Sequence, residues 1–291
     1  MVVNGRASAA GAASLVPGVA QVAAARERLS LDWVVTESEA ELHAALTAAD
    51  GRRVVLVGGD GSLHAAANAP LHGLPELALV PAGRANNIAR ALGIPTDPAG
   101  AFRVAASSRA RPLDALEVRT PGRTVYAIEA LSAGFQADAR SRYAGDNSAD
   151  LRQGVRVLAR AVRRYAPYRI EAWLDGRPFA TDRGAQLFIS NLPYFGFGFE
   201  VDPGADPADG RFEAVLLEAG NRRELIGRLA AAYRGNHIGR AGVRRIQARR
   251  AELTSALPLV ADSTPLGTTT ASVRVDRGRL RLATPDVDRR R

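Results

Sequence analysis

The sequence predicts an α/β fold, with an N-terminal doubly wound domain followed by a C-terminal antiparallel β-sandwich domain. In the first part of the chain, short apolar runs alternate with helical segments, which is typical of a parallel sheet covered by helices. From residue 112 onward, strand-like runs joined by tight turns dominate. We therefore predict domains at 1–111 and 112–284, the second with inserted helices, and a tail at 285–291 whose packing against the first domain is left open.

The first domain is organised around one apolar strand that ends in a glycine-rich turn. Val54 to Val57 have the length and β-branched content of a buried strand, and Gly58, Gly59, Asp60, Gly61 and Ser62 follow directly. The glycines permit close backbone approaches, and we expect Ser62 to cap the helix that starts at Leu63. A strand, a glycine turn and a helix start make a site for an anion such as phosphate.

Asp60 is out of place in an anion site, because a carboxylate repels phosphate unless a metal ion or a proton lies between them. The alternative is a turn aspartate that accepts hydrogen bonds from its own backbone. The three flanking glycines favour the functional interpretation.

The other elements of the first domain support the same sheet. Thr36 and Glu39 form a capping-box pattern for a helix that runs to about Ala48. Leu77 to Val80 form a second apolar strand, closed by a turn at 81–83 and followed by a helix from Asn86 to Leu92. Ligands of such sheets bind at the carboxyl ends of the strands, where both glycine turns are expected.

The second domain contains many strand-like runs and two clear helices. The helices are expected at about 151–165 and 222–233. The expected strands are 113–118, 124–131, 169–174, 185–191, 212–218, 257–261 and 271–275.

Composition restricts the chemistry of the chain. Its 291 residues, 46% of them apolar, are enough for two cores, and the absence of cysteine excludes disulfides, zinc thiolate sites and cysteine nucleophiles. All 39 basic residues are arginine, so neither a Schiff-base lysine nor a Walker lysine can operate. The net charge of +9 suits an acidic partner such as a nucleotide or an anionic membrane surface. Sparse aromatic residues argue against nucleic acid.

Two sequence blocks resemble the diacylglycerol kinase catalytic-domain family, which includes sphingosine, ceramide and bacterial lipid kinases, with NAD kinases as distant relatives. Residues 58–62 (GGDGS) resemble its GGDG[T/S] motif, and residues 81–95 resemble its P-x-G-T-x-N-D-F-A-R-x-L-G-I-P block. Softer matches occur at 132–135, Asn191, 209–210 and 262–265, so the resemblance covers nearly the whole chain.

The resemblance implies an ATP- and Mg²⁺-dependent kinase whose active site lies between an α/β domain and a β-sandwich. It assigns the catalytic role to Asp60, which could act as the base or organise Mg²⁺ through the nucleotide, with Asp262 as a second candidate carboxylate. The implied nucleotide-binding residues are Asn4, Gly58, Gly59, Gly61, Ser62, Gly83, Arg84 and Asn86.

Four departures from the family pattern weaken the expected catalysis. Arg84 replaces a threonine, Asn87 an aspartate and Gln136 an aspartate. Thr264 stands where the family has a glutamate that is a proposed general base, and threonine cannot accept a proton near neutral pH. Asp262, two residues earlier, is the candidate substitute.

Several other residues have a simpler structural interpretation. His64 and His237 are expected to be packing or surface residues, and the histidine spacing predicts no zinc site. Asp206 and Asp209 could hold a structural Mg²⁺, although a solvated acidic loop is favoured. Phe195, Phe197 and Phe199 suit a half-buried strand.

We expect an ATP-dependent kinase that phosphorylates a hydroxyl of a diacylglycerol-like or sphingoid lipid. The alternatives are a nucleotide-binding homologue with impaired transfer and a kinase for a soluble hydroxylated metabolite. The sequence carries no transmembrane-length apolar segment and no signal peptide, so a cytoplasmic location is expected, with peripheral contact to the inner face of the membrane. Self-association as a homodimer is left open.

Overall fold

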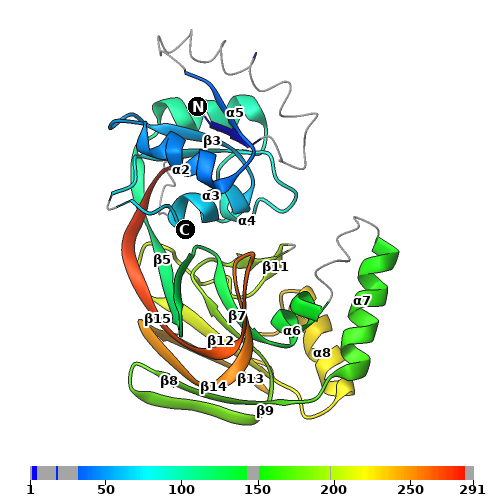
Figure 1. Cartoon of the computed structure of the whole chain (residues 1–291). Coiled ribbons are helices and arrows are strands. Elements are labelled where there is room, and N and C mark those ends of the chain that lie inside the picture. Colours follow the sequence, from blue (N-terminus) through cyan, green and yellow to red (C-terminus); the bar gives the residue numbers. More distant parts are fainter. Residues whose placement is uncertain are drawn as a thin grey trace. The chain divides into compact units, whose positions relative to one another are not determined.

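The computed structural model describes residues 2–4, 18, 32–71, 73–142, 151–196 and 198–285, without the side chains of 3–4 and 151–155. The chain forms two compact units (Figure 1). The first comprises residues 1–115, 196–198 and 277–291, and the second comprises 116–195 and 199–276.

The first unit contains a parallel sheet with the strand order β2-β1-β3-β4. Every residue of β3 and β4 is buried, as expected when helices cover both faces of a parallel sheet. The α/β class predicted for this part of the chain is confirmed. The strands are β1 (Val2–Asn4), β2 (Val34–Thr36), β3 (Val54–Gly58) and β4 (Leu77–Pro81), and the helices are α2 (Glu39–Thr47), α3 (Asp60–Ala67), α4 (Asn87–Ala91) and α5 (Pro98–Ser107).

The start of α2 differs from the sequence prediction. The N-cap is Ser38, whose hydroxyl accepts a hydrogen bond from the Glu41 backbone N–H, while the Glu41 carboxylate accepts one from the Glu37 N–H. Thr36 cannot fill this role because it is the last residue of β2. The capping chemistry was predicted, but at the wrong residue.

The second unit is built from antiparallel strands, which confirms the predicted β-sandwich class. Its main ladder has the order β13-β12-β9-β7-β14-β15, while β8 pairs with β9 and β14, and β6 pairs with β5. The strands are β5 (Ala110–Thr120), β6 (Arg123–Ala127), β7 (Ala130–Gly134), β8 (Tyr168–Leu174), β9 (Arg177–Ser190), β10 (Tyr194–Phe195), β11 (Phe199–Glu200), β12 (Phe212–Glu218), β13 (Val243–Ala248), β14 (Arg250–Ala261) and β15 (Thr264–Ala283). The helices are α6 (Phe135–Arg142), α7 (Leu151–Arg164) and α8 (Arg222–Tyr233). Within the part of the chain that the structure describes, no helix is long and apolar enough to span a bilayer.

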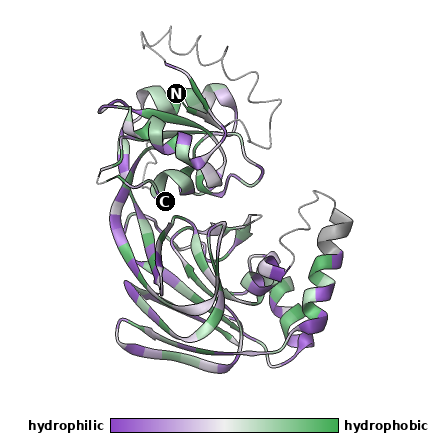
Figure 2. Cartoon of the chain, viewed as in Figure 1, coloured by the Kyte–Doolittle hydropathy of each residue, from purple (hydrophilic) through white to green (hydrophobic). Residues whose placement is uncertain are grey.

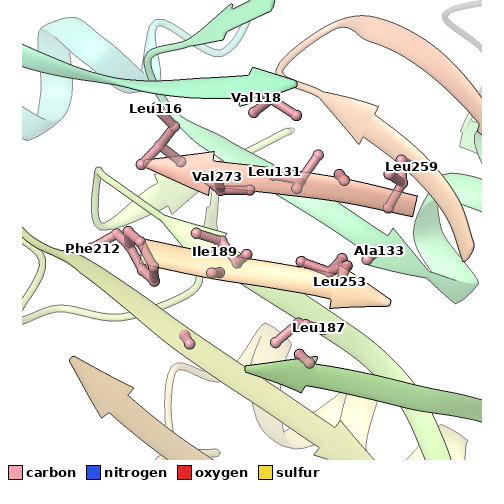
Figure 3. Packing of buried hydrophobic residues seen from close by; sticks show 14 of the residues in the cluster. Leu116, Val118, Leu131, Ala133, Leu187, Ile189, Phe212, Leu253, Leu259 and Val273 are labelled. Atoms are coloured by element: carbon pink, nitrogen blue, oxygen red, sulfur yellow. The ribbon is translucent and has the colours of Figure 1, made fainter. Parts of the chain in front are cut away.

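Two apolar clusters lie on opposite faces of the β12 region. Leu216 belongs to the sandwich core with Leu131, Ile189 and Leu259, several of which Figure 3 shows. Its neighbours Val215 and Leu217 belong to a second cluster with helical residues of α7 and α8. This alternation is the period of two of a strand whose faces are both covered.

The division of the chain differs from the predicted boundaries in two places. The first boundary falls inside β5, between Ala115 and Leu116, and residues from Arg277 onward return to the first unit. There the end of β15 pairs in parallel with β4 through Leu282 and Leu77. Of the predicted tail at 285–291, only residue 285 is among the residues that the structure describes.

Candidate functional site

Two glycine turns meet at the carboxyl edge of the first unit's sheet. Gly58 at the end of β3 pairs with Pro81 at the end of β4, and the Ala82 N–H donates to the Gly58 carbonyl at 2.8 Å. A Cβ added to Gly59 would lie 2.9 Å from the Gly83 Cα, and one added to Gly83 would lie 2.6 Å from the Gly59 Cα. We call the two turns, residues 58–62 and 82–86, the glycine cradle. Only glycine at both positions permits this approach.

Asn86 fastens the second turn of the glycine cradle. Its φ of 49° lies in the left-handed region, which asparagine tolerates better than most residues. Its side-chain oxygen accepts the Gly83 N–H at 3.0 Å, and its amide nitrogen donates to the Gly83 carbonyl at 3.0 Å. Asn86, predicted to bind nucleotide, therefore holds the turn that carries Gly83.

Asp60 links α3 to the start of α4. Its Oδ2 accepts the Asn87 N–H and its Oδ1 accepts the Ile88 N–H, both at 3.0 Å. Asn86, the N-cap of α4, provides no capping side chain of its own, so Asp60 supplies the cap from another helix.

The start of α3 presents a polar backbone without a capping side chain. Its N-cap is Gly59, and the predicted cap Ser62 is instead a buried residue of the first turn, whose N–H donates to the Gly59 carbonyl. A side chain is unnecessary there if an anion takes its place. Gly61 is exposed, and a Cβ added to it would meet no atom within 4 Å, while Arg84 is also exposed.

A pocket of about 230 Å³ lies beside the glycine cradle in the same unit. It is lined partly by Thr36 and Ser38, at and just after the end of β2, and by Gly61 and Ser62 of α3. Sequence reasoning missed Thr36 and Ser38 as site residues, although their place at the end of a strand of the same sheet was a usable signal. Asn4 ends β1 and pairs with Thr36, so its backbone lies at this edge, while its side chain is outside the described part of the chain.

Asp262 in the second unit is a buried residue that anchors a loop. It lies in the turn between β14 and β15 with a φ of 47°. Its Oδ2 accepts the Ile128 N–H at 2.7 Å, and its Oδ1 accepts those of Glu129 and Ala130 at 2.9 and 3.0 Å. Asn191 holds the same loop by donating to the Ile128 carbonyl. The carboxylate is thus committed to three backbone donors.

Gln136 and Thr264, two of the departures from the family pattern, lie in different environments. The Gln136 Oε1 accepts a hydrogen bond from the Ser132 hydroxyl at 2.8 Å. The backbone N–H of Gln136 donates to the side-chain oxygen of Gln186. A neutral amide suits this network, in which Gln186 also donates to Ser132. Thr264 is half-buried at the first position of β15.

The acidic loop of the second unit is occupied by hydrogen bonds of its own. Asp206 accepts the Ala208 N–H, and Asp209 accepts the Arg211 N–H and the Gln247 amide. Across the residues that the structure describes, no group of three Asp, Glu or His side chains could hold a metal ion. The structural Mg²⁺ site stays a prediction.

Next to this loop, one arginine neutralises two buried carboxylates. Arg245 forms ion pairs with Asp202 and with Glu213, whose side chains are 3% and 2% exposed. Burial raises the pKa of Glu213, and the Arg245 guanidinium opposes the shift.

The two histidines considered in the sequence are both buried. His64 lies in α3, and the Nε2 of His237 is 2.9 Å from the Val201 carbonyl oxygen.

The chain thus belongs to the class of two-unit proteins in which an α/β unit with a parallel sheet accompanies an antiparallel β-sandwich unit. Residues 1–118 match the diacylglycerol kinase catalytic domain, and residues 129–284 match the YegS C-terminal NAD kinase beta sandwich-like domain. The chain therefore belongs to the diacylglycerol kinase catalytic-domain family, in the group that carries the YegS-type C-terminal domain.

Individual relatives agree with this assignment. The chain is 30% identical to a diacylglycerol kinase of Bacillus subtilis over 195 residues, which are 64% of this chain and 61% of the relative. It is 33% identical to a probable YegS-like lipid kinase of Stenotrophomonas maltophilia over 56% of this chain and 55% of that one. These alignments thus span less than two thirds of the relatives' lengths. A crystal structure of a diacylglycerol kinase from Bacillus anthracis superposes with a TM-score of 0.73 at 15% identity, over 98% of this chain and 96% of that one, and shares the fold.

Proposed function

We propose that the protein is an ATP-dependent lipid kinase, which transfers the γ-phosphate to a hydroxyl of a diacylglycerol-like or sphingoid lipid at the cytoplasmic face of a membrane. The observation that carries the proposal is the close approach of Gly59 and Gly83 beside the start of α3. This arrangement exposes backbone rather than side chains at the sheet edge where such folds bind ligands. Family membership supports the reaction class.

The glycine cradle fits a polyphosphate. Backbone N–H groups at the start of α3 would hold the phosphates, which explains how a chain without lysine can bind them. Asn86 and Asp60 would keep the two turns in place, and Arg84 is an exposed cation on the same loop. The adjacent pocket, with Thr36 and Ser38, offers space for another part of the nucleotide.

The nucleotide, more than the protein, would supply the ligands of the metal ion. Mg²⁺, when bound, would spread the negative charge of the triphosphate. Asp60 is the carboxylate that this chain offers at the cradle, and the departure at Asn87 removes a second one. We infer that phosphate oxygens and water supply most of the metal ligands.

Asp60 is also the best candidate for the proton acceptor. In the proposed step the acceptor oxygen forms a bond to the γ-phosphorus and the bond to the β-phosphate oxygen breaks, so that ADP leaves. Asp60 takes the proton of the attacking hydroxyl, directly or through water. Asp262 is a weaker candidate than the sequence predicts, because its oxygens bind three backbone N–H groups.

One observation favours a second function, a nucleotide-binding homologue with impaired transfer. Both predicted catalytic carboxylates hold backbone loops, and Thr264 occupies the position of the family's glutamate. The glycine cradle would then bind ATP without efficient turnover.

Labelled ATP incubated with a panel of lipids and soluble alcohols tests these functions. The wild type is compared with Asp60→Asn and with Asp97→Asn, which alters a carboxylate that caps α5 in the same unit. The proposal expects transfer to lipid that Asp60→Asn reduces at least about a hundredfold and Asp97→Asn leaves largely intact. ATP binding without transfer to any acceptor would support the second function, and label confined to soluble alcohols would identify a metabolite kinase.

A further inference from the structure

A second pocket, of about 590 Å³, lies on the β-sandwich unit, and its lining residues all belong to that unit. The turn between β8 and β9 bounds it on one side and the start of β14 on the other. Its lining residues are Trp173, Asp175, Gly176, Arg249, Arg250 and Glu252. Pockets that bind small molecules have volumes of about 300–1,000 Å³, so this one is large enough for a ligand.

The backbone beneath this pocket is held in place by Asp175. Asp175 and Gly176 have φ angles of 47° and 78°, the left-handed pair of a tight hairpin turn. The Asp175 carboxylate accepts the backbone N–H groups of Arg249 and Arg250 at 3.1 and 2.9 Å, and the Asp175 N–H donates to the Arg250 carbonyl at 3.0 Å. The turn that carries the two arginines is therefore fixed through their main chain, and their side chains are not needed to hold it.

The guanidinium groups of Arg249 and Arg250 carry charge that no carboxylate of the described residues pairs with. Both residues are exposed, and neither side chain forms a hydrogen bond or an ion pair in that part of the chain. Arg274, which lies opposite Arg250 on β15, is in contrast paired with Glu117. Two adjacent unpaired guanidinium groups at one end of a pocket suit a phosphate.

Trp173 provides an aromatic surface near the other end of the pocket. The residue is 46% exposed, which is unusual for a tryptophan. It lies directly opposite Glu252 in the register of β8 and β14. Arg250 lies two residues before Glu252 on the same exposed face of β14, and Figure 2 shows the alternation of hydrophilic and hydrophobic residues along the strands of this unit. Two residues of a strand span about 6.5 Å, which is comparable with the width of a ribose between a base and a phosphate.

We propose that this pocket is a second ligand site, which binds a nucleoside monophosphate. The base stacks on the Trp173 ring, and the guanidinium groups of Arg249 and Arg250 bind the phosphate. The Glu252 carboxylate accepts hydrogen bonds from the ribose hydroxyls. Aromatic side chains stack on bases of every kind, because every base has a π-face. Carboxylates bind ribose hydroxyls in dinucleotide-binding folds, so each of the three chemical groups has a counterpart in the ligand.

The combination of groups favours a nucleotide over a simpler anion or a protein. Inorganic phosphate would use the two arginines alone, and the Glu252 carboxylate would repel it. A protein partner usually covers about 800 Å² on each side of an interface, whereas this site is a hollow between two tight turns. Only a ligand that joins a flat ring, hydroxyl donors and a phosphate uses all three groups.

Intrinsic fluorescence reports on this pocket, because the chain has only two tryptophans. The full chain with Trp33→Phe retains Trp173 alone, and a base stacked on its ring should quench its emission. Adenosine monophosphate (AMP) should quench saturably, with a Kd below about 1 mM that rises with sodium chloride. Adenosine should quench, and inorganic phosphate should displace AMP, only at concentrations at least about tenfold higher. The measurement involves no turnover, so its result is independent of the proposed kinase activity.

The double variant Arg249→Gln/Arg250→Gln tests the phosphate contacts in the same single-tryptophan background. It keeps the backbone N–H groups that bind Asp175, and it should weaken AMP binding at least about tenfold. The matched control is Arg222→Gln/Arg223→Gln, which removes two adjacent exposed arginines at the start of α8 and should bind AMP like the parent. Circular dichroism should show that every variant is folded. Equal weakening in both double variants would overturn the proposal, as would the lack of saturable quenching up to about 10 mM AMP.

Gly83→Ala separates this pocket from the glycine cradle. In the single-tryptophan background, this substitution should weaken ATP binding measured by calorimetry and leave the quenching by AMP unchanged. Quenching that Gly83→Ala abolishes and Arg249→Gln/Arg250→Gln preserves would mean that AMP binds at the cradle, and would overturn the proposal. A single-stranded oligonucleotide that binds more tightly than AMP would identify a nucleic acid as the occupant instead. Self-association that Trp173→Leu abolishes, without any quenching by AMP, would identify a second copy of this chain.

Discussion

Replacing Gly83 with alanine should disrupt the glycine cradle. The new Cβ would lie 2.6 Å from the Gly59 Cα and 2.8 Å from the Asn86 Oδ1, whereas carbon atoms pack at about 3.5–4.0 Å. The nearest atom, the Gly59 Cα, belongs to the backbone and cannot rotate away as a side chain could, so the two turns must move apart by about 1 Å. Such overpacking costs about 1–3 kcal/mol, and distortion of the Asn86 hydrogen bonds adds about 1 kcal/mol.

Thermal unfolding and ATP titration by calorimetry measure this effect. A destabilisation of about 2–4 kcal/mol should lower the unfolding midpoint by about 5–15 °C, and ATP affinity should fall at least about tenfold because the phosphate-binding turn is displaced. Gly61→Ala is the matched control for stability. Its Cβ meets nothing within 4 Å and its position is helical, so alanine should stabilise α3 by about 0.5–1 kcal/mol. If Gly83→Ala melted and bound ATP like the wild type, the geometric basis of the glycine cradle would be wrong.

Three further predictions concern the second unit. Asp262→Ala should destabilise the protein by about 2–4 kcal/mol in urea unfolding, because it leaves three backbone N–H groups without their acceptor. Arg245→Met should cost about 3–5 kcal/mol in the same measurement, because the buried carboxylates of Asp202 and Glu213 lose their counter-charge. Burial lowers the pKa of His237, so the wild type should lose stability as the pH falls below about 6.5, and His237→Gln should remove this dependence.

The sign for His237 follows from where the proton binds. The unfolded chain carries an ordinary histidine that takes up a proton near pH 6.5, whereas the buried ring resists protonation and its Nδ1 has no hydrogen-bond partner among the described residues. Stability is therefore full above the unfolded pKa and decreases as the pH falls toward the folded one. An identical pH profile for wild type and His237→Gln would contradict this account.

The other two variants have their own contradicting outcomes. A hundredfold loss of kcat in folded Asp262→Ala would restore Asp262 as a catalytic candidate. An unaltered unfolding curve for Arg245→Met would mean that water solvates the carboxylates of Asp202 and Glu213.

The parts of the site that depend on local sequence could be predicted. Val54 to Val57 form the strand because a short β-branched run suits a doubly covered sheet, and the glycine turn follows it as expected. Helix caps were predicted less well, because the residue that caps a helix depends on where the preceding strand ends. Gly59 and Ser38 are the N-caps in place of Ser62 and Thr36.

The partners of the two carboxylates could not be predicted. Asp60 binds N–H groups 27 and 28 residues away, and Asp262 binds N–H groups 132 to 134 residues away. An aspartate in a glycine-rich or tight turn has the same sequence signature whether it anchors a loop or performs chemistry. The packing of the chain decides which donors reach it, and the sequence carries no local sign of that distance.

The end of β15 affects the order in which the chain can complete its fold. Residues 1–115 are synthesised before the segment from Arg277 that pairs with β4, and about 160 residues of the chain separate the two. Arg279 donates to the Ala67 carbonyl and Arg281 pairs with Glu76, so this segment also closes the ends of α3 and β4. Until it arrives, β4 has an open edge that can pair with another chain. A ribosome that stops before residue 277 would thus release an aggregation-prone protein, even though every residue of the glycine cradle had been made.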